Sequence, residues 1–394
     1  MPGEAQCVDV GIVGSGIAGS ALAAALAGSG LSVALLDRRQ GGLDSARGDH
    51  IQPAVQPILE RWGVLNTLVL SGAEQRHGTR WFDTEGRLLV KIPVPERADC
   101  APAFLYLNHE QIGDVLLTHA VEQGAIDISG ISDWSLDRVR GGWQIHWAGA
   151  GESGTLRCTL LVGADGTASP VRSKLGVRID RHRYQYPIAV LYGRLMDTPE
   201  MRTLDVHLLH ERMVSMIPRT GGGTKIGFPI ASDELSMWRN QPESVLHNQL
   251  QQWCPNLEFE HLAFGAVYPP VSQQAESYRG DGAAVLIGDA RHAMHPARSM
   301  GMNTCFRVAD RLASLLKGLR AGFAEAELLP LLQTFEQQFD KEVTQRLAEN
   351  HAAGLQMDTL SGNGFPKLVE QLRSAAENPA ISTAMALKAA GLEG

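Results

Sequence analysis

The sequence lacks the features that mark several protein classes. Its five cysteines are odd in number and widely spaced, and no C-x-x-C pair occurs, which argues against a disulfide framework or a zinc ribbon. No Lys/Arg cluster is present and the net charge is −8, which argues against nucleic acid or an anionic membrane surface as a partner. Internal repeats and low-complexity tracts are also missing. We therefore expect a globular protein with free thiols and no bound metal.

The N-terminal part lacks the basic region of a secretory signal, and with the free thiols this predicts a cytoplasmic protein. The stretch 10–36 contains no charge and could be read as a membrane span. Its glycines at 14, 16, 19, 28 and 30 and its strand–turn–helix–strand pattern favour a βαβ unit instead, so we expect no transmembrane segment. With 394 residues, 44% of them hydrophobic, the chain can form two or three domains.

The βαβ unit carries the motif Gly14-x-Gly16-x-x-Gly19 between a short apolar run and an Ala/Leu-rich helical pattern. In this context the motif predicts a dinucleotide site. Gly14 permits a tight turn, Gly16 lets a pyrophosphate approach the backbone, and Gly19 lets the helix lie close to the strand. The N–H groups of the first helical turn, from Ile17 and Ala18 onward, would face the phosphates. The motif alone does not choose between NAD and FAD.

The next strand ends in Asp37, which is placed to bind a ribose hydroxyl pair. Three arginines follow in a polar loop, at Arg38, Arg39 and Arg47. Guanidinium groups match phosphate oxygens in bidentate geometry, so we predict that one of the three binds phosphate.

Two later stretches repeat the pattern of a buried strand that runs into an acidic turn. One is the apolar run 160–162 followed by Gly163-Ala164-Asp165-Gly166, and the other is the run 283–287 followed by Gly288-Asp289. Together with the glycine turn, they predict a parallel sheet whose strand ends line one crevice. A second G-x-G-x-x-G, typical of enzymes with two dinucleotide domains, is missing.

The remaining patterns predict a mixed α/β chain. We expect a helix over 51–62, a hairpin over 79–92, a helix over 110–123, strands within 126–147, four strands within 188–230, a helix over 242–253, a strand over 262–268, a helix over 301–319, and helices from 325 to the end. Ser169-Pro170 is expected to open a short helix as N-cap and first residue.

In this order the three motifs resemble those of the single-component, group A FAD-dependent aromatic hydroxylases of the para-hydroxybenzoate hydroxylase type, over about residues 8–350. The glycine motif matches the ADP-binding motif of that family. The stretch 163–166 with Arg172 matches its D-G motif, and 288–292 with Pro296 and 301–303 matches its G-D motif.

The resemblance implies an α/β fold with a Rossmann-like FAD-binding domain of the GR2 type, an inserted mixed β-sheet substrate domain and C-terminal helices. The FAD-binding domain would comprise 1–75, 100–180 and 270–325. The substrate sheet would comprise 76–99 and 181–269, and the helical region 326–394.

Matching positions imply roles toward the cofactor. Asp37 should bind the adenosine ribose, Arg47 should contact the pyrophosphate, and Asp165 should sit behind the phosphates. Asp289 should bind a ribityl hydroxyl, and Pro296 should lie near the flavin ring. The backbone of three residues should face the pyrimidine edge of the flavin, namely Gly301, Met302 and Asn303.

The chain departs from the family pattern at several positions. His109 stands where members have arginine or glutamine, and we expect it to contact the FAD phosphate or ribityl chain, with a structural helix-end histidine as the alternative. Ser299-Met300 replaces the common glycine-glutamine, and Val308 replaces an acid. These changes affect the expected conformation of the loop over the flavin, and not the FAD site itself.

The substrate sheet offers several inward-facing candidates. They are Tyr192, His207, Met213, Ser215, Met216 and Phe228, of which about half are expected to pack in the sheet's own core. Met213, Met216 and Phe228 are our substrate contacts, because methionines suit an apolar, adaptable pocket. Tyr192, His207 and Pro296 are the catalytic candidates. A base that ionises a phenol could be His207 or His210, with a surface histidine as the favoured alternative for each.

The resemblance implies a monooxygenase in which NAD(P)H reduces bound FAD, O2 forms a flavin C4a-hydroperoxide, and an aromatic or quinone-like molecule is hydroxylated. A related reductase or epoxidase, or a flavin-binding protein without turnover, remains an alternative. The halogenase motif G-W-x-W-x-I-P is not matched, because both tryptophans are missing from 212–218. The chain is expected to be a monomer or a homodimer, of use in ring catabolism or secondary metabolism.

Overall fold

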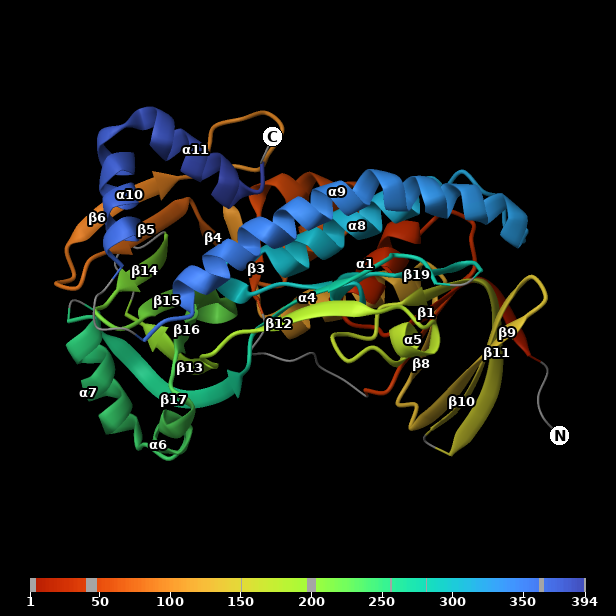
Figure 1. Cartoon of the computed structure of the whole chain (residues 1–394), viewed down its shortest axis with the longest axis horizontal. Coiled ribbons are helices and arrows are strands. Elements are labelled where there is room, and N and C mark those ends of the chain that lie inside the picture. The colour runs from red at the N-terminus through yellow and green to blue at the C-terminus, as the bar shows by residue number, and fades with distance from the viewer. Residues whose placement is uncertain are drawn as a thin grey trace.

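The structure is a computed structural model that describes residues 5–39, 48–149, 151–196, 203–255, 257–280, 282–360 and 365–392. Two large sheets lie at opposite ends of the long axis, and the long helices α8 (Met300–Leu316) and α9 (Glu325–Met357) run along one side of the molecule (Figure 1). Within the described ranges, none of the helices combines the length and apolar character that a bilayer crossing requires.

The first sheet is parallel at its centre. Its parallel strands run in the order β8 (Ile126–Ser129), β2 (Val33–Asp37), β1 (Gln6–Val13) and β11 (Glu152–Gly163), with β8 at the edge, and β19 (Ala284–Leu286) pairs with β11. Every one of these neighbouring pairs is parallel. The stretches 8–13, 33–37, 160–163 and 284–286 of these strands are continuously buried because both faces of the central sheet are covered there. The predicted parallel sheet is confirmed.

One face of this sheet packs against helices, and an antiparallel extension widens it. Helices α1 (Ile17–Leu26), α4 (His109–Glu122) and α8 share one hydrophobic cluster with the central strands. The extension is formed by β10 (Gly142–Gly149), which pairs with the first half of β11, and by β9 (Asp133–Val139), which pairs with β10.

The second sheet has the strand order β17-β13-β16-β15-β14-β5-β6. Its strands are β5 (Gly78–Phe82), β6 (Leu88–Pro93), β13 (Ile188–Leu195), β14 (Leu204–Leu208), β15 (Met213–Arg219), β16 (Gly223–Pro229) and β17 (Phe259–Tyr268). The hairpin of β5 and β6 therefore joins a sheet formed mainly by strands that begin only at Ile188. We call this sheet the substrate sheet, as the sequence predicts.

Helices cover parts of both faces of the substrate sheet (Figure 1). Helices α6 (Leu235–Arg239) and α7 (Glu243–Trp253) pack on one face, and α10 (Pro366–Glu377) and α11 (Pro379–Ala390) pack against β6 on the other. Among the described residues three short helices remain, α2 (Gln56–Arg61), α3 (Leu65–Leu70) and α5 (Pro170–Lys174). One small sheet has the strand order β3 (His50–Ile51), β7 (Phe104–Tyr106), β4 (Glu74–Arg76). Another has the order β12 (Ile179–Arg183), β18 (Val271–Ala275), β20 (His292–Ala293).

Most predicted elements are found, but the helix expected over 51–62 is shorter. His50 and Ile51 instead form β3 and pair with Tyr106 and Leu105. A 3-10 turn over Pro53–Val55 follows, and α2 begins only at Gln56. Proline disfavours a helical conformation in the residue before it, so Pro53 delays the helix.

Candidate active site

Three strand ends meet at one edge of the parallel sheet. The glycine turn follows β1, the 163–166 turn follows β11, and the 288–289 turn follows β19. Because β1 pairs with β11 and β11 with β19, the three turns are neighbours, as predicted. The carboxyl edge of such a sheet is where ligands bind in doubly wound folds.

Asp37 holds the glycine turn from the end of β2. Its carboxylate accepts the backbone N–H of Ser15 at 2.7 Å and the Ser15 hydroxyl at 3.1 Å. Arg39 donates to the same carboxylate through Nε at 3.2 Å and Nη2 at 3.0 Å. Burial would raise the pKa of Asp37, but the hydrogen bonds from Arg39 and Ser15 hold it below its ordinary value. Asp37 is therefore an ionised acceptor beside the predicted ribose site.

The three glycines of the motif differ in what surrounds them. A Cβ on Gly19 would lie 1.9 Å from the Gly14 carbonyl oxygen, and one on Gly14 (φ +107°) would lie 2.4 Å from the Ala164 carbonyl oxygen. These two glycines are needed for close backbone packing. A Cβ on Gly16 would meet only the Arg39 Nη2 atom, at 3.7 Å, so the space in front of Gly16 is open.

Asp165 lies directly behind this turn, and its carboxylate is occupied within the chain. It accepts from the Ser169 hydroxyl and, at 2.9 Å, from the backbone N–H of Val171. Ser169 in turn caps α5 as predicted, accepting from Arg172 N at 2.9 Å. Asp165 therefore orders the turn behind the phosphate position.

Gly288 brings Asp289 to the start of α1. Gly288 has φ +57°, and a Cβ there would lie 2.5 Å from the Ala18 Cβ. The backbone carbonyl of Asp289 accepts from Gln273 Nε2 at 3.0 Å, while its side chain is half-buried. Asp289 is thus held at the rim of the glycine turn.

The third part of the edge is the beginning of α8. Ser299 adopts the left-handed conformation (φ 50°) and caps the helix without a side-chain hydrogen bond. Gly301 and Met302 are half-buried, and Asn303 is buried. Asn303 Nδ2 donates to the His50 carbonyl at 2.9 Å, and its Oδ1 accepts from Gln52 N at 2.9 Å. The segment 48–52 is therefore fastened to the first turn of α8.

Just before α8, His295 supports the exposed residue Pro296. Its Nδ1 accepts from Ala297 N at 3.0 Å, and its carbonyl accepts from Asn350 Nδ2 at 2.9 Å. Burial lowers the pKa of His295 to about 4. His295 is therefore a neutral structural support for the turn that carries Pro296.

These residues fit an adenine dinucleotide with a flavin. Helix α1 begins without a side-chain cap and without an acid in its first turn, so no side-chain cap takes up the first N–H groups of the helix, which suits a phosphate ligand. Helix α8 also begins without either feature, which suits an electron-rich carbonyl edge. The open space before Gly16 and the acids Asp37 and Asp289 complete a cradle for FAD.

Three other residues predicted to contact the cofactor are not placed in this cradle by the structure. Arg38 is exposed, and Arg47 lies outside the described residues. His109 begins α4 and is buried; its Nδ1 lies 2.8 Å from the Gly48 carbonyl, and its backbone N–H donates to Asp49 at 3.0 Å. His109 contacts the segment 48–52, and its role toward FAD stays a prediction.

A cluster of four charged residues that sequence reasoning missed lies between this segment and the substrate sheet. Lys225 Nζ lies 2.7 Å from Asp49 Oδ2, and Arg219 Nε lies 3.5 Å from the same oxygen. Arg219 Nη2 pairs with Glu110 at 3.2 Å. The side chains of Asp49 and Lys225 are 0% and 3% exposed. The one feature of the sequence that could have indicated this cluster is Lys225, a charged residue in the otherwise uncharged strand β16.

The side of the substrate sheet that carries Lys225 faces the cofactor domain. Strand register places Tyr192 and Ile217 beside Lys225. The Arg219 guanidinium lies 4.7 Å from the centre of the Tyr192 ring. Tyr192 thus lies on the correct side for its predicted role, which stays a prediction.

Two of the three predicted substrate contacts, Phe228 and Met216, pack in the sheet's own core and are corrected, whereas Met213 lies on the same side as Lys225 and its substrate role stays a prediction. Phe228 is fully buried against Trp238 and Trp253 on the α6–α7 side. Met216 lies on that same side, and Met213 packs in the cluster that includes α10 and α11. Strand alternation separates the two faces, but the sequence did not show which face each residue occupies.

His207 is corrected for the same reason. It pairs with Val214, next to the Asp205–Met216 pair, and so lies on the face opposite Lys225. Its ring stacks on Phe82 with centroids 4.6 Å apart, and neither ring nitrogen has a hydrogen-bond partner in the described part of the chain. Burial lowers the pKa of His207 to about 4, so it is a neutral core histidine.

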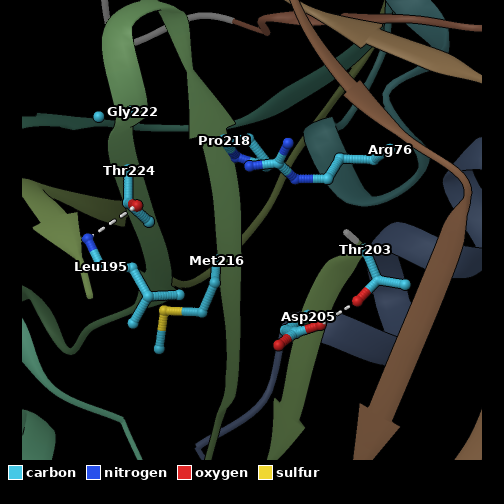
Figure 2. A pocket seen from close by; sticks show the side chains of 9 residues that line it. Arg76, Leu195, Thr203, Asp205, Met216, Pro218, Gly222 and Thr224 are labelled. Atoms are coloured by element: carbon cyan, nitrogen blue, oxygen red, sulfur yellow. Dashed lines mark hydrogen bonds between the residues drawn. The ribbon is translucent and has the colours of Figure 1, made fainter. Parts of the chain in front are cut away.

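A small cavity borders Met216 (Figure 2). Its volume is about 20 Å³, enough for a single water molecule at most. Figure 2 shows Thr203 bonded to Asp205 and Thr224 bonded to the backbone of Leu195 at its walls. The cavity does not have the size of a substrate pocket.

Comparisons with known proteins show the family and the fold. The family model of the FAD binding domain matches residues 7–347. The chain is 25% identical over 323 residues to a ubiquinone hydroxylase of Neisseria meningitidis, covering 78% of this chain and 68% of the relative. It is 26% identical over 387 residues to tetracenomycin A2 monooxygenase-dioxygenase of Streptomyces glaucescens, covering 84% and 65%. The crystal structure of p-nitrophenol 4-monooxygenase from Pseudomonas putida has the same fold, with a TM-score of 0.80, 16% identity and 99% coverage of both chains.

Proposed function

The chain belongs to the FAD-binding-domain family of flavin-dependent monooxygenases, and we propose that it uses NAD(P)H and O2 to hydroxylate a neutral aromatic or quinone-like molecule. The observation that carries this proposal is the meeting of the glycine turn, the 288–289 turn and the first turn of α8 at one sheet edge. The names of the relatives support the substrate class, because they include a ubiquinone hydroxylase and a tetracenomycin monooxygenase.

The residues described above divide the cofactor among them. The glycine turn and the start of α1 would hold the pyrophosphate, Asp37 the adenosine ribose and Asp289 the ribityl chain. Gly301, Met302 and Asn303 would hold the pyrimidine edge through the start of α8. When bound, FAD would supply the redox chemistry, accepting a hydride from NAD(P)H and activating O2.

The chain itself positions the substrate and excludes water. Tyr192 and the apolar residues of the cofactor-facing side of the substrate sheet would form the wall opposite Pro296. The charges of Lys225 and Arg219 are balanced by Asp49 and Glu110, so the net charge of this cluster is zero. A substrate without a carboxylate fits such a wall.

Two further proposals concern the cellular compartment and the oligomeric state. The five cysteines are free, which fits the reducing cytoplasm. We keep the expectation of a monomer or homodimer, which size-exclusion chromatography with light scattering would decide.

The test begins with the purified yellow protein. We expect bound flavin in near-stoichiometric amount, and oxidation of NADH or NADPH that phenols or quinones accelerate. A protein that neither nucleotide reduces would refute the monooxygenase proposal. Asp289→Ala should weaken FAD retention, and an unchanged FAD affinity would count against the ribityl role of Asp289.

A further inference from the structure

Asp49 is the point where three elements are joined by charge. Its Oδ1 accepts the backbone N–H of His109, the first residue of α4, at 3.0 Å. Its Oδ2 lies 2.7 Å from Lys225 of β16 and 3.5 Å from Arg219 of β15. One carboxylate thus links the cofactor-domain helix α4 to two strands of the substrate sheet.

The link is reinforced on both sides. Arg219 also pairs with Glu110 of α4 at 3.2 Å, and the Thr220 hydroxyl donates to Gln111 Oε1 at 2.6 Å. On the other side, Asn303 fastens the segment 48–52 to the first turn of α8. A displacement of Asp49 would therefore reach the helix end that is to hold the flavin.

Stability alone does not explain a pair buried this deeply. Removing two charges from water costs more than their attraction returns in many proteins, and apolar replacements of buried pairs are often neutral or stabilising. The same sheet holds a second buried pair, Arg80–Asp205, with Nη2 2.6 Å from Oδ2 and side-chain exposures of 17% and 3%. That pair joins β5 to β14 within the sheet and does not reach the cofactor domain.

We propose that Asp49 and Lys225 are positioning residues for the flavin reaction. Their ion pair sets the segment 48–52 against the substrate sheet and so fixes the distance between the flavin edge at α8 and the wall that holds the substrate. This inference rests on the proposed function, and it goes beyond it by giving the junction between the two sheets a direct part in the rate. Neither side chain is assigned a proton-transfer step.

The test compares two double variants of the whole chain. In Asp49→Leu/Lys225→Met the pair at the junction is replaced by apolar side chains, and in Arg80→Met/Asp205→Leu the control pair is replaced in the same way. Three quantities are measured for each protein: the unfolding midpoint, the dissociation constant for FAD, and the rate of anaerobic flavin reduction by NADPH or NADH in the presence of a phenol or quinone that accelerates it, resolved into a maximal rate and a nucleotide KM.

We expect the junction variant to unfold at the wild-type midpoint or above it, while its maximal reduction rate falls about ten- to a hundredfold, the range that small misplacements of reacting groups produce. The control variant should reduce its flavin at a rate within about twofold of wild type. Equal reduction rates in wild type and the junction variant would overturn the proposal, and so would equal losses in both variants.

If the junction variant does not fold, Asp49→Glu takes its place, because it keeps the charge and moves the carboxylate by one methylene. A maximal reduction rate lowered by tenfold or more supports positioning, and an unchanged rate refutes it. A wild-type protein that binds FAD but is not reduced by NADPH or NADH would refute the proposed function. FAD affinity and unfolding do not depend on that function, because both are measured without any substrate. If the wild-type protein is not reduced, the FAD dissociation constant decides whether the pair positions the cofactor: a wild-type value in the junction variant would refute this part of the inference as well, and a raised value would support it.

Discussion

The backbone N–H of Ser15 donates to the carboxylate of Asp37 at 2.7 Å, so the end of one strand holds the phosphate turn of the strand beside it. We expect Asp37→Ala to weaken FAD binding about tenfold or more, because both the proposed ribose ligand and the support of the turn are lost. Asp37→Glu keeps the carboxylate and should retain most of the affinity. Fluorescence titration with FAD measures both, and an alanine variant with wild-type affinity would contradict this assignment.

Gly16 and Gly19 should respond in opposite ways to substitution. Gly16→Val should leave the fold intact, because an added Cβ meets only the Arg39 Nη2 atom, at 3.7 Å. It should give colourless protein, because the side chain would fill the open space that the pyrophosphate is proposed to occupy. Gly19→Ala should destabilise the fold by about 1–3 kcal/mol, because its Cβ would lie 1.9 Å from a carbonyl oxygen. Flavin absorbance and urea unfolding separate the two effects. A yellow Gly16→Val protein would show that the cofactor lies elsewhere.

The pH dependence of stability should carry a signal from Asp49. Burial raises its pKa from 3.8 to about 6 although Lys225 and Arg219 lower it, and Glu110 adds to the increase. The folded protein therefore binds this proton more tightly than the unfolded chain, and the stabilisation present at low pH is lost as pH rises from 3.8 to about 6. Asp49→Asn keeps an uncharged group throughout this range.

The two proteins should thus have similar free energies of unfolding near the lower end of this range. Above pH 6 the free energy of unfolding of the asparagine variant should exceed that of the wild-type protein by a few kcal/mol, on the order of 3. Urea unfolding at several pH values measures the difference. Parallel curves would show that Asp49 titrates at its ordinary value.

Phe228 should behave as a core residue. Phe228→Ala should cost about 3–5 kcal/mol of unfolding free energy, because the ring packs between Trp238 and Trp253. Phe228→Leu, which fills most of the volume, should keep the FAD affinity and the KM for an accelerating phenol. A raised KM in a leucine variant of normal stability would restore the substrate role that the structure argues against.

The sequence predicted the parallel sheet and its cofactor edge because each strand end carries a local signal, such as the glycine motif or the turn before Asp289. It did not predict which side of the substrate sheet faces the cofactor, because Met216 and Lys225 both lie in short alternating strands whose orientation depends on distant partners. Asp49 was missed because its meaning depends on Lys225, 176 positions away by residue number. Pairings of this kind are set by tertiary packing.

The order of strands in the parallel sheet has a consequence for synthesis. The glycine turn is translated among the first twenty residues, but β11 and β19, whose turns complete the same edge, follow at 152–163 and 284–286. During synthesis the edge of β1 that pairs with β11 therefore stays unpaired until β11 has been translated, and β11 in turn lacks its partner β19. Contacts between segments this far apart along the chain form slowly. FAD can therefore find its full site only when most of the chain has emerged, and free flavin in the cell would act late, on a nearly finished protein.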